Sequence, residues 1–456
     1  MDYLQRLYAW LRRLMGDELD DRLKRYFLSG AYKSLRLQGA IAALTFLTAL
    51  FIARTTGEEG FGIYSTVFTW VAILSVGATL GLDDLALKQL PLYQAHHRHD
   101  QIRGFLRWSN GWGLLSGVGV AAATLLVARA TDIKGLSNYW GYYCWAVWVI
   151  PLFVLMHVNQ AALRGLQQIG RGQLAEKVVQ PLAFFVLLVG CYYWQGVALT
   201  DLQAVIARLG AFMVTAVAAF YLLYKGTQAY QSATLSYEKQ RWWRRCRYFG
   251  LTSILYIFHT RMDIIWLSYY ETAATQIAHY NAALKLSDLA LIPFAVLYRV
   301  TAPMFSILHA EGDWVGLQLF YTMTTRLSFG LIASILLGLL LLGHWLLGWF
   351  GPGFRQGYPM LMILCGVKLL HVFVGPVNYL LMMVDLEREA TGLLLLTVIA
   401  TTAIHHWWVP LYGTTGAAWG TFAGTVLFEL GMVVLAYRKA GIMPTVLGRF
   451  FQKKQP

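Results

Sequence analysis

Charged residues are scarce in this sequence, and their scarcity excludes the commonest classes of protein. Asp, Glu, Lys and Arg make up 13% of the 456 residues, whereas hydrophobic residues make up 57%. A soluble domain carries about a quarter charged residues, and a disordered chain contains far fewer apolar residues than this one. The mean hydropathy is positive, at +0.51. The composition therefore indicates a polytopic membrane protein.

Cysteine, nucleotide-binding motifs and long loops are also lacking. The four cysteines (Cys144, Cys191, Cys246 and Cys365) have neither metal-ligand spacing nor a paired framework. No Gly-rich phosphate-binding loop with its lysine occurs, which disfavours ATP-driven transport by this chain alone. A membrane glycosyltransferase or polymerase would need a sizeable outer loop or a loop-borne pair of acids. We therefore expect a protein that is not an enzyme and has no metal and no bound cofactor.

Long apolar runs are abundant and predict an all-α protein of twelve transmembrane helices. The predicted spans cover residues 38–54, 62–82, 108–128, 139–160, 178–196, 202–224, 248–270, 276–304, 327–350, 357–384, 390–410 and 412–437. Residues 1–36 are too charged for a cleavable signal. Leu4, Leu7, Leu11 and Leu14 instead give this segment the spacing of an amphipathic helix at the membrane surface.

The basic residues orient these spans. With both termini in the cytoplasm, 28 of the 37 Lys and Arg residues fall in cytoplasmic segments, four in outer loops and five within spans. Cytoplasmic loops of membrane proteins carry such an excess, and here they face anionic lipids of the inner leaflet. This arrangement accounts for the net charge of +14 without a nucleic-acid partner.

The basic inner loop 225–247, which contains six Lys and Arg residues, divides the chain into two sets of six spans. Spans one and two are joined by Arg54–Ser65, spans seven and eight by Tyr270–Asn281, and Tyr64 aligns with Tyr280. An even number of helices in each copy gives a parallel repeat, with substrate near the midplane between the halves and alternating access. The predicted domains are an amphipathic N-terminal segment (1–36), an N-lobe (37–224), a basic inter-lobe loop (225–247), a C-lobe (248–437) and a basic tail (438–456).

Five short motifs, spread along nearly the whole chain, resemble one family. They are Ile52-Ala-Arg-Thr-Thr-Gly-Glu-Glu-Gly-Phe-Gly-Ile-Tyr64, Leu80-Gly-Leu-Asp83, Leu163-Arg-Gly-Leu-Gln-Gln168, Arg261-Met-Asp263 with Tyr280-Asn-Ala-Ala-Leu-Lys285-Leu, and Tyr412-Gly-Thr-Thr-Gly-Ala-Ala-Trp-Gly-Thr-Phe422. In this order they resemble bacterial polysaccharide flippases of the Wzx type, in the multidrug/oligosaccharidyl-lipid/polysaccharide exporter superfamily. The family's Leu-Gly-Pro is replaced here by Thr56-Gly57-Glu58.

Ionisable residues within spans are costly and are therefore candidate functional residues. The five cations are Arg208, Arg261, Lys285, Arg299 and Lys368, and the clearest acids are Asp263, Asp288 and Glu429. Arg261, Asp263, Lys285 and Lys368 lie about 14 to 20 Å into their spans, near the middle of the hydrocarbon layer. A net cationic interior favours an anionic substrate, because Arg binds phosphate oxygens as a fork and Lys as a point charge. We predict that the five cations hold a pyrophosphate and its glycan.

Several of these residues have an alternative, structural interpretation. Lys285 and Asp288 are three residues apart and could neutralise each other, and Arg299 could reach the interface as a snorkelling side chain. His259 and Asp263 share one helix face, where they would bind a proton or Na⁺ and couple transport, or pack as structural groups. Asp263, Asp288 and His259 are thus candidates for charge tuning and coupling. Pro293 predicts a bend or hinge in span eight.

By resemblance, the protein is expected to be a MATE-like, twelve-helix flippase of two six-helix lobes in the bacterial cytoplasmic (inner) membrane. It would move a polyprenyl-pyrophosphate-linked oligosaccharide across that membrane for surface polysaccharide synthesis. The expected partners are this lipid-linked substrate, anionic membrane lipids and polysaccharide polymerase or export machinery, and a monomer is expected. Two alternatives stay open: a cation-coupled multidrug antiporter of the same superfamily and a flippase for lipid-linked peptidoglycan precursors.

Overall fold

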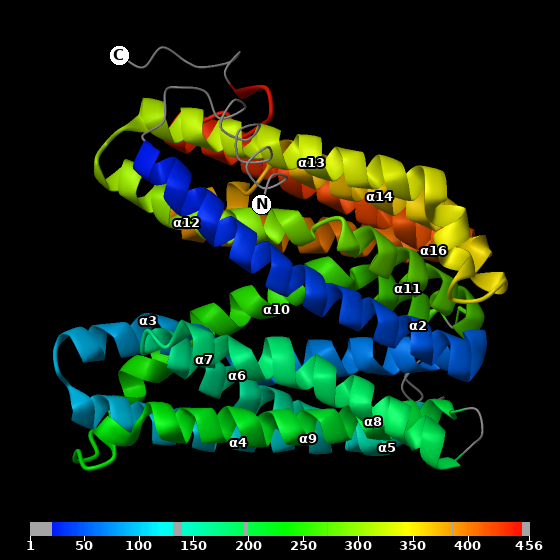
Figure 1. Ribbon diagram of the computed structural model, residues 1–456, viewed down its shortest axis with the longest axis horizontal. Helices are drawn as coiled ribbons and strands as arrows, with labels where there is room; N and C mark the ends of the chain where they lie inside the picture. The colour runs from blue at the N-terminus through cyan, green and yellow to red at the C-terminus, as the bar shows by residue number, and fades with distance from the viewer. Residues whose placement is uncertain (1–20, 131–138, 196–198, 271, 385, 449–456) are drawn as a thin grey trace. The chain divides into compact units, whose positions relative to one another are not determined.

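The computed structural model describes residues 21–130, 139–195, 199–270, 272–384 and 386–448. Every regular element in these ranges is a helix, which confirms the predicted all-α class (Figure 1). The elements are α2 (Asp21–Thr79), α3 (Leu82–Ala95), α4 (His99–Ala130), α5 (Trp140–Ala146), α6 (Val149–Gly165), α7 (Ile169–Leu174), the π-helix η2 (Ala175–Val179), α8 (Gln180–Gln195), α9 (Asp201–Gly226), the 3₁₀-helix η3 (Gln228–Tyr230), α10 (Lys239–Tyr269), α11 (Ala274–Leu289), α12 (Ile292–Ala310), α13 (Trp314–Gly348), the 3₁₀-helix η4 (Gly353–Gly357), α14 (Tyr358–Val374), α15 (Val377–Met383) and α16 (Glu387–Ala440).

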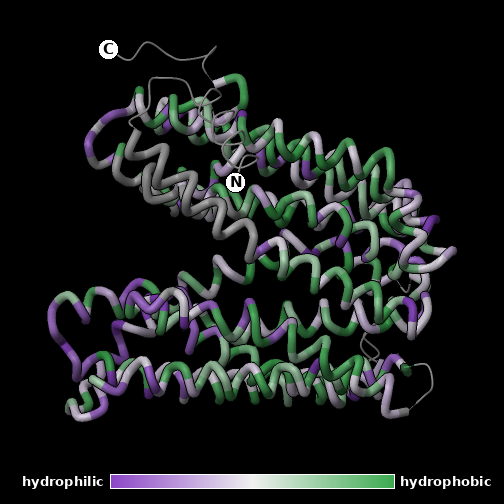
Figure 2. The backbone as a smooth tube through the Cα atoms, in the orientation of Figure 1, coloured by the Kyte–Doolittle hydropathy of each residue, from purple (hydrophilic) through white to green (hydrophobic). Residues whose placement is uncertain are grey.

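Eight helical stretches among the described residues are long and apolar enough to cross a membrane. Two of them, Gln38–Ala95 and Arg388–Ala440, each contain two predicted spans. The remaining predicted spans, seven and eight, correspond to α10, which is rich in polar residues, and to α11 with α12, which are separated by a break. Along each part of the chain, hydrophobic residues follow the helices, and hydrophilic residues gather at turns such as the one between α3 and α4 (Figure 2). The protein is a multi-pass membrane protein.

Glycine breaks each of the two longest helices where the sequence predicts a turn between spans. In α2, Gly57 has φ 75° and ψ −174°; in α16, Gly413 has φ 57° and ψ −132°. These backbone conformations are accessible to glycine and strained for residues with a Cβ atom. The first and last pairs of predicted spans are therefore joined by single-glycine breaks instead of long loops.

The described chain forms two compact units, of which the first contains residues 44–281. Within it, α6 packs against α3, α4 and α9, and α8 packs against α9 (Figure 1). In the most apolar stretch of the span containing α6, 72% of the residues are buried. The corresponding shares are 28% for α4 and 39% for α9. The fourth predicted span thus lies at the centre of this unit, and the apolar faces of α4 and α9 stay exposed, as lipid-facing helices require.

The second unit contains the described residues from 282 to 448 together with 21–43. Within it, α14 packs against α13 and α16, and α12 packs against α13 and α15. In the most apolar stretch of the span containing α14, 56% of the residues are buried, whereas the share for α13 is 28%. This central helix contains most of the tenth predicted span, the counterpart of span four in the proposed repeat. The boundary between the two units falls within α11, so α10 belongs to the first unit. The predicted C-lobe instead begins at residue 248, before α10 ends. The predicted lobe boundaries stay a prediction.

A row of glycines joins the two halves of α16 into a tight hairpin. Cβ atoms built on four of these glycines would come within 3 Å of atoms on the opposite arm: Gly416 near Trp408, Gly420 near His405, Gly424 near Thr401 and Gly431 near Leu393. Glycines with higher residue numbers lie near partners with lower residue numbers, so the two arms run antiparallel. Small residues at such spacing let two membrane helices approach closely, and this explains the Gly-rich motif at 412–422.

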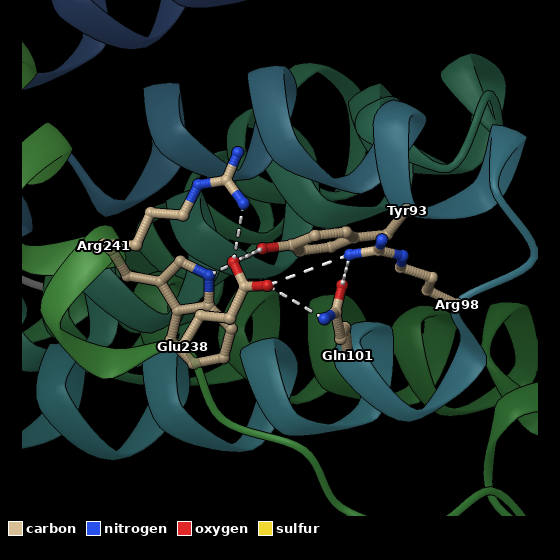
Figure 3. A network of polar contacts seen from close by, with 6 residues as sticks. Tyr93, Arg98, Gln101, Glu238 and Arg241 are labelled. Atoms are coloured by element: carbon tan, nitrogen blue, oxygen red, sulfur yellow. Dashed lines mark hydrogen bonds and ion pairs between the residues drawn. The ribbon is translucent and has the colours of Figure 1, made fainter.

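The basic inter-lobe loop is fastened to the first unit at the α3–α4 turn. Figure 3 shows the carboxylate of Glu238 at the centre of these contacts. It accepts hydrogen bonds from Gln101 at 2.9 Å and from Tyr93 at 3.1 Å, and it pairs with Arg241 at 3.1 Å and with Arg98 at 3.9 Å. Its side chain is 23% exposed, so solvent weakens the ion pairs, and the network as a whole fixes the position of the loop.

Aromatic packing reinforces this attachment. The indole of Trp242 is buried, donates a hydrogen bond to the Tyr93 hydroxyl at 2.8 Å and contacts the rings of Phe105 and Trp108. At Gly104, a Cβ atom would lie 1.9 Å from the carbonyl oxygen of Ser236. Polar contacts, aromatic contacts and close backbone approach together hold the start of α10 against α3 and α4.

Candidate functional site

Arg208 lies in an aromatic pocket inside the first unit. Its guanidinium is 4.6 Å from the ring centroid of Phe184, 5.3 Å from that of Phe212 and 5.8 Å from that of Phe68. The side-chain oxygen of Gln180, with the amide turned toward the guanidinium, lies 3.2 and 3.3 Å from its terminal nitrogens. Cation–π contacts of this kind stabilise a desolvated charge. Among the described residues, no carboxylate contacts Arg208.

Asp263 is a buried acceptor in α10. Its side-chain oxygens accept hydrogen bonds from the Tyr280 hydroxyl at 2.6 Å and from the backbone N–H of Ile264 at 2.8 Å. The residue is 3% exposed. These donors stabilise a carboxylate at this position. Tyr280 is the residue that aligns with Tyr64 in the proposed repeat, and Tyr64 stacks on Phe184 beside Arg208. The two aligned tyrosines thus both lie near an intramembrane charge.

Arg261 has different surroundings from its near neighbour Asp263. Residues two apart on a helix point in different directions, and here Asp263 faces Tyr280 while Arg261 is half-buried. No acidic side chain in the described part of the chain contacts Arg261. A half-buried guanidinium without a carboxylate partner can bind an anionic ligand through its fork of N–H donors.

Lys368 and Asp288 form an ion pair inside the second unit. The Nζ atom of Lys368 on α14 lies 2.6 Å from Oδ1 of Asp288 on α11. The lysine side chain is 15% exposed and the aspartate side chain 44%. The structure therefore brings together two predicted residues that the sequence placed 80 positions apart. In this state the pair is neutral, and Lys368 would have to leave Asp288 to bind an anion.

The other predicted residues lie on the expected helices. Lys285 is half-buried on α11 and His259 is half-buried on α10. Arg299 lies on α12, and its side chain is outside the described residues. Pro293 is the second residue of α12, directly after a break at Ala290 and Leu291. Proline fits the first turn of a helix, so span eight consists of two helices, and the use of this break as a hinge stays a prediction.

Sequence reasoning missed a second contact between a basic and an acidic side chain on α14. Nδ1 of His371 lies 2.5 Å from Oε1 of Glu429 on α16. His371 follows Lys368 by three residues, so both face the same side of α14, and the ring of His371 lies 4.9 Å from that of Phe294. The sequence indicates Glu429 as an intramembrane acid but does not indicate its partner. A histidine within an apolar run is the signal that points to His371.

A third pair connects the two segments that the sequence aligns as repeat loops. Nε2 of His279 lies 2.8 Å from Oε2 of Glu58, one residue after the Gly57 break. The imidazole is 6% exposed and the carboxylate 33%. At Gly62 a Cβ atom would lie 1.9 Å from the carbonyl oxygen of Ala274. This pair thus fastens the predicted outer segment 54–65 to the start of α11.

Each unit thus contains charged and hydrogen-bonded groups within its apolar helices. Among the described residues, no cluster of three His, Cys, Asp or Glu side chains has the arrangement of a metal site. The two intramembrane arginines of the first unit, Arg208 and Arg261, contact no carboxylate of the described chain, while in the second unit Lys368 and His371 each contact one.

Comparison with known proteins adds two findings. A family model described as "Polysaccharide biosynthesis protein" matches residues 28–309, which is more than half of the chain. No curated protein matches the sequence.

Solved structures of similar fold are transporters. An inward-facing multidrug resistance MATE family transporter of the MOP superfamily superposes with a TM-score of 0.71 at 15% identity, over 90% of this chain and 98% of the other. A MOP superfamily transporter from Pyrococcus furiosus, whose binding pocket has reverse polarity, gives 0.67 at 16% identity, over 94% and 98%. The outward-facing MATE transporter gives 0.66 at 16% identity, over 94% and 98%. At these identities the likeness shows a shared fold.

Proposed function

The chain belongs to the polysaccharide biosynthesis protein family, and from this membership we propose that it is a flippase for a polyprenyl-pyrophosphate-linked oligosaccharide. It moves this lipid from the inner to the outer leaflet of the bacterial cytoplasmic membrane by alternating access. Family and fold are those of a membrane transporter, not of an enzyme. Anionic lipids and polysaccharide polymerase or export machinery are the proposed partners, and the proposed functional form is a monomer.

The observation that carries this proposal is the position of Arg261 within its span and the lack of a carboxylate contact there. It lies about 20 Å along a predicted span, is half-buried, and contacts no carboxylate of the described chain. A cation at that depth is costly unless a partner compensates it. A pyrophosphate supplies at least two negative charges and oxygens spaced for a guanidinium fork. Arg261 is therefore the proposed first contact of the pyrophosphate.

Lys368 is proposed as a second contact of the pyrophosphate, which becomes available when a phosphate replaces the Asp288 carboxylate as its partner. In the described state it is neutralised by Asp288 at 2.6 Å. An arriving phosphate would compete with the carboxylate for the ammonium, and Asp288, the more exposed partner, would be left to water. Lys285 and Arg299 are proposed to add positive charge along α11 and α12. Arg208, enclosed by three phenylalanine rings, is proposed to act through packing more than through direct contact.

The rival function is multidrug antiport, because solved transporters of the same fold include multidrug resistance proteins. Cationic drugs would require an acidic site. In the Pyrococcus furiosus transporter, the reverse polarity of the binding pocket suggests a different function of that protein. The cationic groups of this chain likewise make an anionic substrate the better match. A lipid-linked peptidoglycan precursor carries the same pyrophosphate and is the second alternative.

Binding to the purified protein in nanodiscs tests the proposal. We would compare a polyprenyl-pyrophosphate oligosaccharide with a lipophilic cationic dye, using wild type, Arg261→Ala and Arg244→Ala. Arg244 is an exposed arginine on the same helix and controls for loss of one charge. We expect glycolipid affinity to fall about tenfold or more in Arg261→Ala, because a charge-assisted hydrogen bond contributes about 1.5–3 kcal/mol, and to stay unchanged in Arg244→Ala.

Three outcomes would revise the proposal, the last of them with a lipid-linked peptidoglycan precursor as a third ligand. Dye binding without glycolipid binding would favour the antiporter. Glycolipid binding that is equally strong in both variants would leave a flippase in place and remove Arg261 from its site. A lipid-linked peptidoglycan precursor that binds more tightly than the oligosaccharide lipid would select the second alternative.

A further inference from the structure

We propose that Glu429 and His371 form a proton-binding site inside the second unit. The site takes up one proton, shared between the carboxylate and the imidazole. Its existence follows from the geometry of the pair alone. Its use to couple transport to a proton gradient rests on the proposed function.

The geometry is that of a buried carboxylate with one partner. The side chain of Glu429 is 2% exposed. One oxygen lies 2.5 Å from Nδ1 of His371, and the other, Oε2, is buried and has no hydrogen-bond partner among the described residues. Buried polar groups nearly always have a partner. The second oxygen is therefore a position that can carry a proton.

Charge arithmetic fixes the number of protons. A neutral imidazole beside an ionised carboxylate carries one net negative charge, and such a charge is expensive to hold in an apolar interior. One added proton makes the pair neutral, and with that proton on the unpartnered Oε2 atom the pair is an imidazole and a carboxylic acid. Nδ1 of His371 and Oε1 of Glu429 are in direct contact at 2.5 Å, so the two groups can exchange this proton. The site is therefore filled by one proton and empty when that proton leaves.

Among the described residues, the side chain of His371 makes an ion-pair contact with the Glu429 carboxylate. The hydroxyl-bearing side chains of Tyr298 on α12 and Tyr321 on α13 lie nearby. Arg326 of α13 donates to the backbone carbonyl of Val446 at 2.8 Å. Lys368, one turn before His371 on α14, pairs with Asp288. Among these groups, His371 is the basic side chain in contact with the buried carboxylate.

The difference in exposure between the two partners gives the proton a route. His371 is 37% exposed, whereas Glu429 is 2% exposed. A proton can therefore reach the imidazole from outside the unit and pass through Nδ1 to the carboxylate. Lys368 shares this face of α14, so that its charge lies one turn from the site. Movement of Lys368 away from Asp288 would place an uncompensated cation there, which favours release of the proton.

The ligand set favours a proton over a sodium ion. Hard cations require several oxygen ligands, and the pair offers one unoccupied carboxylate oxygen together with an imidazole. The predicted alternative site, His259 with Asp263, has the carboxylate occupied by Tyr280 and a backbone N–H. Glu429 is thus the better candidate for the proton.

Infrared difference spectroscopy on the purified full-length protein in nanodiscs tests proton binding directly. Acidification of wild type should produce a protonated-carboxyl band, and Glu429→Gln should abolish that band. His371→Gln should shift its midpoint to a different pH. The control His406→Gln changes an exposed histidine on α16 and should leave the band unchanged. Because His371→Gln keeps the carboxylate, it provides a second test if Glu429→Gln fails to fold.

Several results would overturn the proposal. The same carboxyl band in wild type and Glu429→Gln would exclude Glu429 as the acceptor, and an unchanged midpoint in His371→Gln would exclude the shared proton. Loss of the band on addition of NaCl, with choline chloride as control, would assign the site to sodium. Glycolipid movement in proteoliposomes separates the two proposals. A normal band without glycolipid movement contradicts the flippase, and movement that ignores a pH gradient contradicts coupling.

Discussion

Each intramembrane charge of this protein has its own set of partners, and these partners distinguish structural residues from candidate binding residues. Asp263 accepts hydrogen bonds from Tyr280 and a backbone N–H, and the guanidinium of Arg208 lies against aromatic rings. Arg261 lacks a carboxylate contact in the described chain. The residues that remain available for a ligand are therefore fewer than the charged residues that the sequence contains.

The hydrogen bond between Tyr280 and Asp263 gives a residue-scale prediction. Tyr280→Phe removes the hydroxyl and leaves a buried carboxylate oxygen without that donor, which should cost about 1–3 kcal/mol of stability. Tyr269→Phe is the matched control, because Tyr269 is 48% exposed. Thermal unfolding in detergent should show a lower Tm for Tyr280→Phe alone. Equal Tm values for both variants would show that Asp263 does not depend on this bond.

Helices α2 and α16 show how glycine determines the shape of an element. Each contains a glycine in a backbone conformation that a Cβ atom disfavours. In α16 the break is followed by the glycine row of the hairpin, where close approach depends on the missing Cβ atom. Each of these elements thus serves as two spans, separated by a glycine with non-helical dihedrals.

Two glycine-to-alanine changes in α16 should have opposite effects. Gly424→Ala places a methyl group 2.6 Å from Oγ1 of Thr401, and Gly392→Ala places one in open space. Overpacking costs about 1–3 kcal/mol, whereas alanine in an open helical position gains up to about 1 kcal/mol over glycine. Unfolding midpoints should therefore fall for Gly424→Ala and rise or stay level for Gly392→Ala. A lower midpoint for Gly392→Ala would contradict the assigned hairpin faces.

At the scale of the whole molecule, the chain combines two units with a central helix in each, α6 and α14. The first unit includes α10, which is fastened to α3 and α4 through Glu238 and Trp242. The long basic loop is therefore an attached part of the first unit, and the unit boundary lies beyond α10, within α11.

The predicted orientation can be tested by cysteine labelling of intact cells. Cys144 and Cys191 would be replaced by alanine. Cys246 can stay, because burial raises the pKa of its thiol to about 12 and little thiolate forms at neutral pH; Cys365 is buried. A membrane-impermeant maleimide should label Arg355→Cys from outside and Arg244→Cys only after permeabilisation. The reverse pattern would invert the predicted topology.

Composition and hydropathy were sufficient to predict a multi-pass, all-α membrane protein, and the motifs were sufficient to predict its family. These properties depend on local sequence, because each spanning helix must satisfy its own backbone hydrogen bonds and be apolar over its length. Both glycine breaks fall where the predicted spans meet. Positions of charges along the helices could likewise be counted from the sequence.

The partners of those charges were decided by the tertiary structure alone. Lys368 with Asp288, His371 with Glu429, and the aromatic pocket of Arg208 join helices distant in sequence. Helical spacing indicates which residues share one helix face, but pairing between helices depends on packing and rotation that a single sequence does not encode locally. The sequence by itself thus determined what kind of protein this is and where its charges lie. Only the packing of helices decided which charges neutralise one another and which stay available for a ligand.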